Sequence, residues 1–279
     1  MRQMSYDERN DDPRPTEELI RLALTERDED MAWESVTALH FRGSREVLEA
    51  AERLCDSTLA TERELGATLL GQLGVPERTF PEECFDTLAK MIQCESDPDV
   101  LQAIAIAFGH LDDPRCLELL IPLKAHPSDI VRWGVVHGIS GHDFPEAIET
   151  LIELSRDKDE EIRDWATFGL GTLIDTDSAE VREALWARTS DTYGDARAEA
   201  LMGLARRKDL RTTTLLLKEL AEEDVDSMAI DAAEEFGNPD LLPALLQLKK
   251  RWPENRREEE EWLDRAIASC KGIPEEHRG

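Results

Sequence analysis

The stretch "DIVRWGVVHGIS", residues 129–140, returns in similar form as "EEIRDWATFGLG", residues 160–171. Both stretches begin with acid, aliphatic and arginine residues, place a tryptophan beside or near the arginine, and contain glycines toward the end. With Arg132 and Arg163 as the register, the same pattern fits five further places, two of them weakly. We call the seven positions the slot positions; they are Ala32, Arg63, Leu101, Arg132, Arg163, Arg197 and Ala229.

The steps between successive slot positions are 31, 38, 31, 31, 34 and 32 residues. A near-constant step of this size is typical of a repeat architecture. Each step has room for two helices of about 11–12 residues and two turns. The second helix is visible in segments such as "SREVLEAAERL" (44–54) and "FPEAIETLIEL" (144–154), whose apolar residues recur at helical spacing. Because period-2 strand patterns are nearly absent, we predict an all-α solenoid of about seven helix pairs.

The repeated sequence pattern resembles the short HEAT repeat, "D-x-x-V-R-x-x-A-x-x-x-L-G-x-L-G-D-P", the kind also found in phycobilin-lyase proteins. Asp129, Val131 and Arg132 match the start of that repeat. Its end is matched by Leu70, Gly71, Leu73 and Gly74, and again by Phe108, Gly109, Leu111, Asp113 and Pro114. The resemblance covers roughly residues 27–255 and implies a stack of HEAT-like helix pairs, each of which buries its apolar face against its neighbours. It implies no single activity, because such repeats serve many functions.

The two ends differ from the repeats. We expect an acidic, flexible tail over residues 1–14 and a single solenoid domain over 15–272, closed by capping helices at its ends. The N-terminal cap is predicted over residues 15–25. The C-terminal cap is predicted from the apolar stripe Trp262, Leu263, Ala266, Ile267 and Cys270. Residues 273–279 are predicted to form a loose tail.

The slot arginines are interpreted as structural. A buried or half-buried arginine normally requires a partner, and acids such as Asp129 precede the slot by a few residues. We therefore expect Arg63, Arg132, Arg163 and Arg197 to form hydrogen bonds between adjacent turns. Small residues at Gly138, Gly169 and Gly203 are expected to permit close helix packing.

The charge of the chain restricts its partners. Asp and Glu number 62 against 33 Lys and Arg, which gives a formal charge of −29. Such a chain is repelled by nucleic-acid phosphates and anionic lipid, and it favours a basic partner. No apolar run approaches the roughly 18 residues of a membrane helix. The five cysteines form no C-x-x-C pattern, so we expect reduced thiols in a cytoplasmic protein.

No residue pattern predicts catalysis. His137 and His142 lie about 140° apart around a helix rather than on one face. The loops "GHLDDPRC" (109–116) and "GHDFPE" (141–146) contain ligand-type side chains, but their spacing matches no known metal site. Asp113 and Asp143 are better interpreted as caps of the following helices. We expect no catalytic residue, no metal and no cofactor.

Tryptophans are the candidate binding residues. Trp33 and Trp133 follow their slot positions directly, Trp165 lies one residue further on, and Trp186 belongs to a second helix. Trp33, Trp133 and Trp165 lie off the main apolar stripe. An off-stripe tryptophan marks a contact surface or packs on a neighbouring repeat, and the sequence leaves both interpretations open.

The leading hypothesis is a non-catalytic scaffold or adaptor that binds a basic protein on an acidic solenoid surface. A more specific form of this hypothesis is that the protein is an acidic immunity or antitoxin-like inhibitor of a basic toxin. The resemblance to phycobilin-lyase repeats implies an alternative, a bilin lyase or lyase-partner subunit. Its anchors for bilin propionates would come from His137, His142 and the slot arginines. Nucleic-acid binding is disfavoured, because it requires a basic surface and this acidic chain has only a few basic clusters in its C-terminal part, such as "ARRKDLR" (205–211). The sequence does not indicate an oligomeric state.

Overall fold

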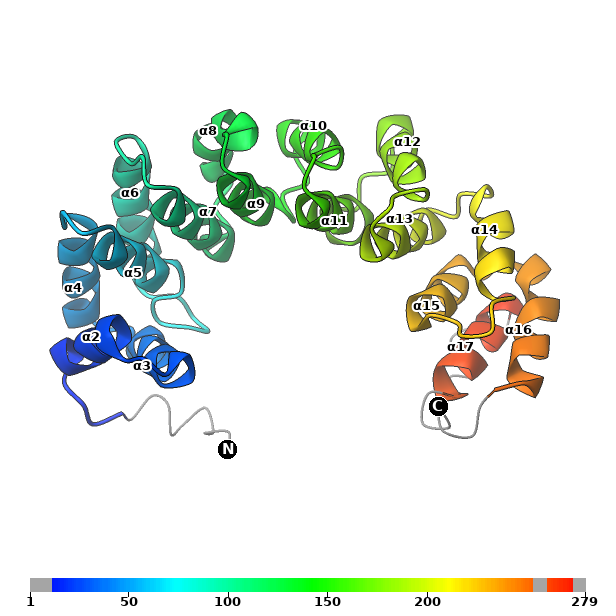
Figure 1. Ribbon diagram of the computed structural model, residues 1–279, viewed down its shortest axis with the longest axis horizontal. Helices are drawn as coiled ribbons and strands as arrows, with labels where there is room; N and C mark the ends of the chain where they lie inside the picture. Colours follow the sequence, from blue (N-terminus) through cyan, green and yellow to red (C-terminus); the bar gives the residue numbers. More distant parts are fainter. Residues whose placement is uncertain (1–11, 253–259, 273–279) are drawn as a thin grey trace. The chain divides into compact units, whose positions relative to one another are not determined.

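A computed structural model of the protein describes residues 12–252 and 260–272. The regular elements of this part of the chain are all helices (Figure 1). First and second helices alternate along the chain in seven pairs. These are α3 (Glu29–Arg42) and α4 (Arg45–Cys55), α5 (Ala60–Gly71) and α6 (Pro81–Ile92), α7 (Pro98–Leu111) and α8 (Cys116–Leu120), α9 (Asp129–Ile139) and α10 (Pro145–Leu154), α11 (Glu160–Phe168) and α12 (Ala179–Arg188), α13 (Gly194–Arg206) and α14 (Thr212–Glu219), and α15 (Ser227–Phe236) and α16 (Leu242–Lys250).

Two further helices flank the pairs. Helix α2 (Thr16–Thr25) contacts α3, α4 and α5, and α17 (Glu260–Cys270) contacts α15 and α16. Every first helix contains one slot position, so the register read from the sequence located all seven pairs. The prediction of an all-α solenoid with terminal capping helices is confirmed.

The contacts divide the chain into two compact units, residues 1–142 and 143–279, here called unit 1 and unit 2. In unit 1 the first helices α5, α7 and α9 pack side by side, and in unit 2 the row is α11, α13, α15 and α17. Figure 1 shows the second helices of each unit on one side of its row. The single domain over 15–272 stays a prediction. Residues 1–11 and 273–279 of the predicted tails lie outside the described residues.

Local sequence sets the helix ends. Side chains of Asp97, Asp159 and Ser178 accept hydrogen bonds from backbone N–H groups of the helices that they precede, which satisfies donors that the first turn leaves open. The segment after Pro114, predicted as one helix, is instead divided. Helix α8 gives way to a 3₁₀ turn, η1 (Ile121–Ala125), because Pro122 has no N–H to continue the α-helical bonding.

Adjacent first helices approach closely at glycine positions. A Cβ atom on Gly203 of α13 would lie 2.5 Å from the Cα atom of Gly171 and 3.0 Å from Leu185 Cδ1. Gly171 belongs to η2 (Gly169–Leu173), a π-helical turn that extends α11. Around these contacts the core consists mainly of Leu, Ala, Ile and Val side chains. Adjacent first helices within a unit therefore pack closely against each other.

Candidate functional site

The slot arginines bind the backbone of the loop that precedes their own helix. Arg132 Nη1 donates to the carbonyls of His126 and Pro127 over 2.8 and 3.2 Å. Arg163, Arg197 and Arg63 repeat this geometry; their Nη1 atoms donate to the carbonyls of Asp157 and Lys158, of Asp191 and Thr192, and of Ser57. The acceptors lie five or six residues before the arginine in every case. Asp129 accepts a hydrogen bond from the backbone N–H of Ile130.

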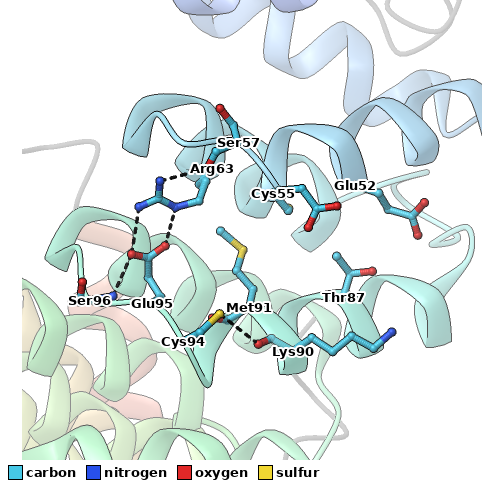
Figure 2. A pocket seen from close by; sticks show the side chains of 11 residues that line it. Glu52, Cys55, Ser57, Arg63, Thr87, Lys90, Met91, Cys94, Glu95 and Ser96 are labelled. Carbon is cyan, nitrogen blue, oxygen red and sulfur yellow. Dashed lines mark hydrogen bonds and ion pairs between the residues drawn. The ribbon is translucent and has the colours of Figure 1, made fainter.

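Arg163 and Arg63 also reach the next repeat. Arg163 Nε and Nη2 donate to the two carboxylate oxygens of Asp191, both over 2.8 Å. Arg63 binds Glu95 in the same forked manner over 2.7 and 3.1 Å (Figure 2). The hydrogen bonds from Arg163 hold the pKa of Asp191 far below its usual range. Each arginine thus joins two successive loops, and we call this arrangement an arginine joint.

A cavity of about 640 Å³ lies beside the joint of Arg63 and Glu95 in unit 1. Figure 2 shows these two side chains facing each other at one end of the cavity, while Lys90 and Glu52 extend at the other end. Burial raises the pKa of Cys55, which lines the cavity, to about 12. That cysteine is therefore a protonated thiol. The cavity is also lined by the exposed cysteine Cys94, by three acidic side chains, Glu52, Asp56 and Glu95, and by two basic ones, Arg63 and Lys90.

The predicted binding tryptophans lie in different settings. Trp33 on α3 is 55% exposed and Trp165 on α11 is 38% exposed. Trp133 is half-buried, and its ring centroid lies 3.8 Å from that of His137. Trp186, on the second helix α12, lies beneath the guanidinium of Arg211 at 4.7 Å.

A second groove, of about 600 Å³, runs across the first helices of unit 2. Side chains from α11 to α17 line it, among them Phe168, Thr172, Glu199, Met202, Arg206 and Asp231. The ring of Trp165 meets that of Phe168 edge to face, with centroids 5.7 Å apart. Trp165 therefore belongs to the aromatic edge of this groove. We call the groove, together with Trp165 and the adjoining Asp164, the acid-aromatic groove.

The carboxylates of the acid-aromatic groove have raised pKa values. Burial, followed by the negative charges of Asp164 and Asp195, raises the pKa of Glu199 to about 7. Burial, followed by the charges of Asp195 and Glu161, raises the pKa of Asp164 to about 6. Burial also raises the pKa of Asp231. Ionising these carboxyl groups is therefore costly in the folded chain, and a nearby cation would offset that cost.

The two cations that line this groove have partners within it. Arg206 Nη1 donates to the carbonyl of Thr172 over 2.6 Å, and Arg265 Nε donates to Glu234 over 3.1 Å. The charge of Arg265 also partly offsets the effect of burial on the pKa of Asp231. Among the described residues, no ion pair is recorded for Asp164, Glu199 or Asp231, and Asp164 Oδ1 is buried without a hydrogen-bond partner. The groove consequently presents an unbalanced negative charge beside two aromatic rings.

Sequence reasoning identified Trp165 but missed Asp164, Phe168, Glu199 and Asp231. The slot register contained a signal for these residues. Most groove residues lie at fixed offsets from the slot position of their first helix: one or two residues, five residues, or nine residues after it. A comparison of the residues at each offset across the repeats would have identified the acids and the aromatic rings as one group.

His137 and His142, two of the residues proposed to anchor a bilin, belong to unit 1, and neither lines the acid-aromatic groove. His137 packs on Trp133, and His142 Nε2 lies 3.7 Å from the sulfur of Cys116, where both side chains are buried. Burial raises the pKa of Cys116 to about 12, so this pair contains a protonated thiol. Within residues 12–252 and 260–272, no group of three or more His, Cys, Asp or Glu side chains is placed to hold a metal ion.

In the part of the chain that the structure describes, no helix combines the length and the apolar character needed to cross a membrane.

Comparison with known proteins agrees with this architecture. A family model described as HEAT repeats matches residues 117–205. Protein YibA of Escherichia coli strain K12 is 27% identical over 228 residues, which cover 79% of this chain and 80% of YibA. The X-ray structure of E. coli YibA superposes with a TM-score of 0.76 at 25% identity and covers 97% of this chain and 98% of that one.

An engineered protein of known crystal structure is similar in fold alone, with a TM-score of 0.53, 18% identity, and coverage of 92% of this chain and 78% of its own. The matched repeat segment and the helical arrangement shared with YibA agree with the slot register and with the seven helix pairs. The chain is therefore an α-solenoid built from HEAT-type repeats.

Proposed function

We propose that this protein is a non-catalytic interaction scaffold that binds a basic segment of a partner protein in the acid-aromatic groove. The observation that carries the proposal is the set of carboxyl groups of Asp164, Glu199 and Asp231, whose pKa burial raises and which form no ion pair among the described residues. A site whose carboxyl groups have raised pKa values favours a ligand that brings positive charge.

The aromatic edge fits the same ligand. A guanidinium or ammonium group packs favourably on the face of an aromatic ring, and arginine in addition stacks on it with its planar group. Trp165 and Phe168 stand beside the carboxylates, so one arginine side chain could contact both kinds of group. Elongated basic segments suit a groove that crosses several repeats, because successive repeats present the same register positions.

The test uses a short arginine-rich peptide and a lysine-rich peptide of equal length and charge. Binding to the full chain is measured by calorimetry, with Asp164→Asn/Glu199→Gln as the groove variant. The matched control is Glu149→Gln/Glu180→Gln, which removes the same charge from exposed positions on α10 and α12. We expect the groove variant to lose about tenfold or more in affinity, on the order of 1.4 kcal/mol, and the control to lose much less. Equal losses in the two variants would show that only the net charge of the chain attracts the peptide.

A further inference from the structure

The loop between α5 and α6, residues 72–80, accounts for most of the extra length of the 38-residue repeat. It is fixed to the preceding repeat. The N–H of Gly74 donates to the carbonyl of His40 over 2.7 Å, and Thr79 Oγ1 donates to the carbonyl of Gly43 over 2.8 Å. Within the loop, the N–H of Arg78 donates to the carbonyl of Gly74 over 2.8 Å. The loop is therefore ordered by its own backbone and by that of its neighbour.

Arg78 occupies an unfavourable backbone conformation in this loop. Its φ angle is 60°, in the left-handed region, which costs a residue other than glycine about 1–2 kcal/mol. Residues held in this way concentrate at functional sites, where the surrounding structure fixes a side chain in one direction. The hydrogen bonds of the loop supply that fixation here.

The guanidinium of Arg78 has no anionic neighbour. Its Nη1 atom is buried, and among the described residues it has no hydrogen-bond partner. Burial lowers the pKa of Arg78, which forms no ion pair among the described residues. The side chain is half-buried in a chain with 62 acidic residues, and the buried part of a cation is normally balanced by an anion.

Neutral hydrogen-bonding groups lie in and beside this loop. Gln72 Nε2 lies 3.2 Å from Nε2 of His110, which is an exposed residue in the last turn of α7. Burial of its ring and the charge of Arg78 lower the pKa of His110. His40 is buried nearby and contacts the carbonyl of Thr68 through Nε2 over 3.0 Å. When the Gln72 amide donates to Nε2 of His110, Nδ1 carries the hydrogen and remains a donor.

We infer that Arg78 and His110 form a binding site for an oxyanion, a phosphate or carboxylate group, on the first-helix side of unit 1. A guanidinium forms forked hydrogen bonds with either group, and the imidazole N–H supplies a further donor. A bound anion would provide the counter-charge that the buried Nη1 atom of Arg78 lacks. This site is separate from the acid-aromatic groove and does not depend on its proposed function.

The test follows the imidazole signals of His110 by NMR in the full chain while inorganic phosphate or acetate is added. An anion bound beside an imidazole favours its protonated form, so the pKa of His110 should rise by about one unit in a saturable manner. His40 and His137, which share electrostatic effects with His110, are followed as well, and His126, which lies on another loop of the unit, serves as the internal reference. The rise should disappear in Arg78→Gln and persist in Arg27→Gln, which alters an exposed arginine of the same unit.

The two anions distinguish the sources of the ligand. A response to phosphate alone identifies a phosphate site, a response to acetate alone identifies a carboxylate site, and a response to both supports the general oxyanion site. His110→Gln provides a second variant, with binding measured by calorimetry, should Arg78→Gln disturb the loop. If neither anion shifts the His110 titration in the wild-type chain, or if Arg78→Gln responds as the wild type does, the inference is wrong.

Discussion

Glu199→Gln should make the protein more stable, and only at higher pH. In the folded chain the pKa of Glu199 lies at about 7, against an ordinary value of 4.5. Between these two pH values the unfolded chain releases a proton that the folded chain keeps. The contribution of Glu199 to stability is therefore most favourable below pH 4.5 and becomes unfavourable as the pH rises to about 7. Glutamine has nearly the same shape and no charge, so the variant does not carry this cost.

The size of the effect follows from the pKa of Glu199. One unit corresponds to about 1.4 kcal/mol, so the upper limit of the cost is about 3 kcal/mol. Water at the open side of the groove screens the charges of Asp164 and Asp195, and we therefore expect a gain of about 1–2 kcal/mol at pH 8. For a chain of this size, that gain should raise the melting temperature by about 2–8 °C.

Thermal unfolding at pH 4 and pH 8, followed by circular dichroism, measures this difference. Glu235→Gln is the control, because Glu235 lines the same groove but is exposed. The variant Glu199→Gln should gain stability at pH 8 and nothing at pH 4. The reasoning fails if the gain is equal at both pH values, or if the variant is less stable than the wild type at pH 8.

Three further outcomes are expected. Gly203→Ala should destabilise the fold by about 1–3 kcal/mol through overpacking, whereas Gly194→Ala, whose Cβ would meet only one arginine nitrogen at 3.7 Å, should be nearly neutral in urea unfolding. Arg163→Ala should destabilise the fold by less than the about 3–5 kcal/mol of a fully unpaired buried charge, because Asp191 loses its forked partner but keeps its ion pair with Arg188 at 2.8 Å; an unchanged melting temperature would contradict a structural role. Association of a basic peptide should slow as salt rises, and Trp165→Ala should speed its dissociation in surface-binding kinetics while Trp33→Ala should not; identical kinetics for the two variants would remove Trp165 from the site.

The sequence predicted the fold well because one residue per repeat marks the register. At the slot, arginine or a small or aliphatic residue falls near the start of each first helix, and the second helices carry their own apolar periodicity. Where a local effect overrode that pattern, the prediction was less accurate. Pro122 shortened a second helix to α8 because the proline cannot donate the hydrogen bond that the pattern required.

The candidate site was harder to predict for a physical reason. Glu199 and Asp164 are two acids among 62, and their side chains become special only when three helices pack and remove water from them. Arg78 depends even more on the folded chain, because its setting comes from a left-handed backbone and from a loop bonded to another repeat. Neither burial nor a loop conformation of this kind has a signature in the order of residues.

The backbone contacts of the slot arginines have a consequence for how such chains diverge. Each contact joins one arginine side chain to backbone carbonyls, which every residue type provides. The loops that supply those carbonyls contain residues as different as Pro127, Lys158 and Thr192. Mutations in these loops can therefore accumulate without loosening the carbonyl contacts, provided that loop length is kept. A solenoid joined in this way can lose most of its recognisable sequence while its architecture persists, which fits a family match confined to residues 117–205 in a chain whose helix pairs extend well beyond them.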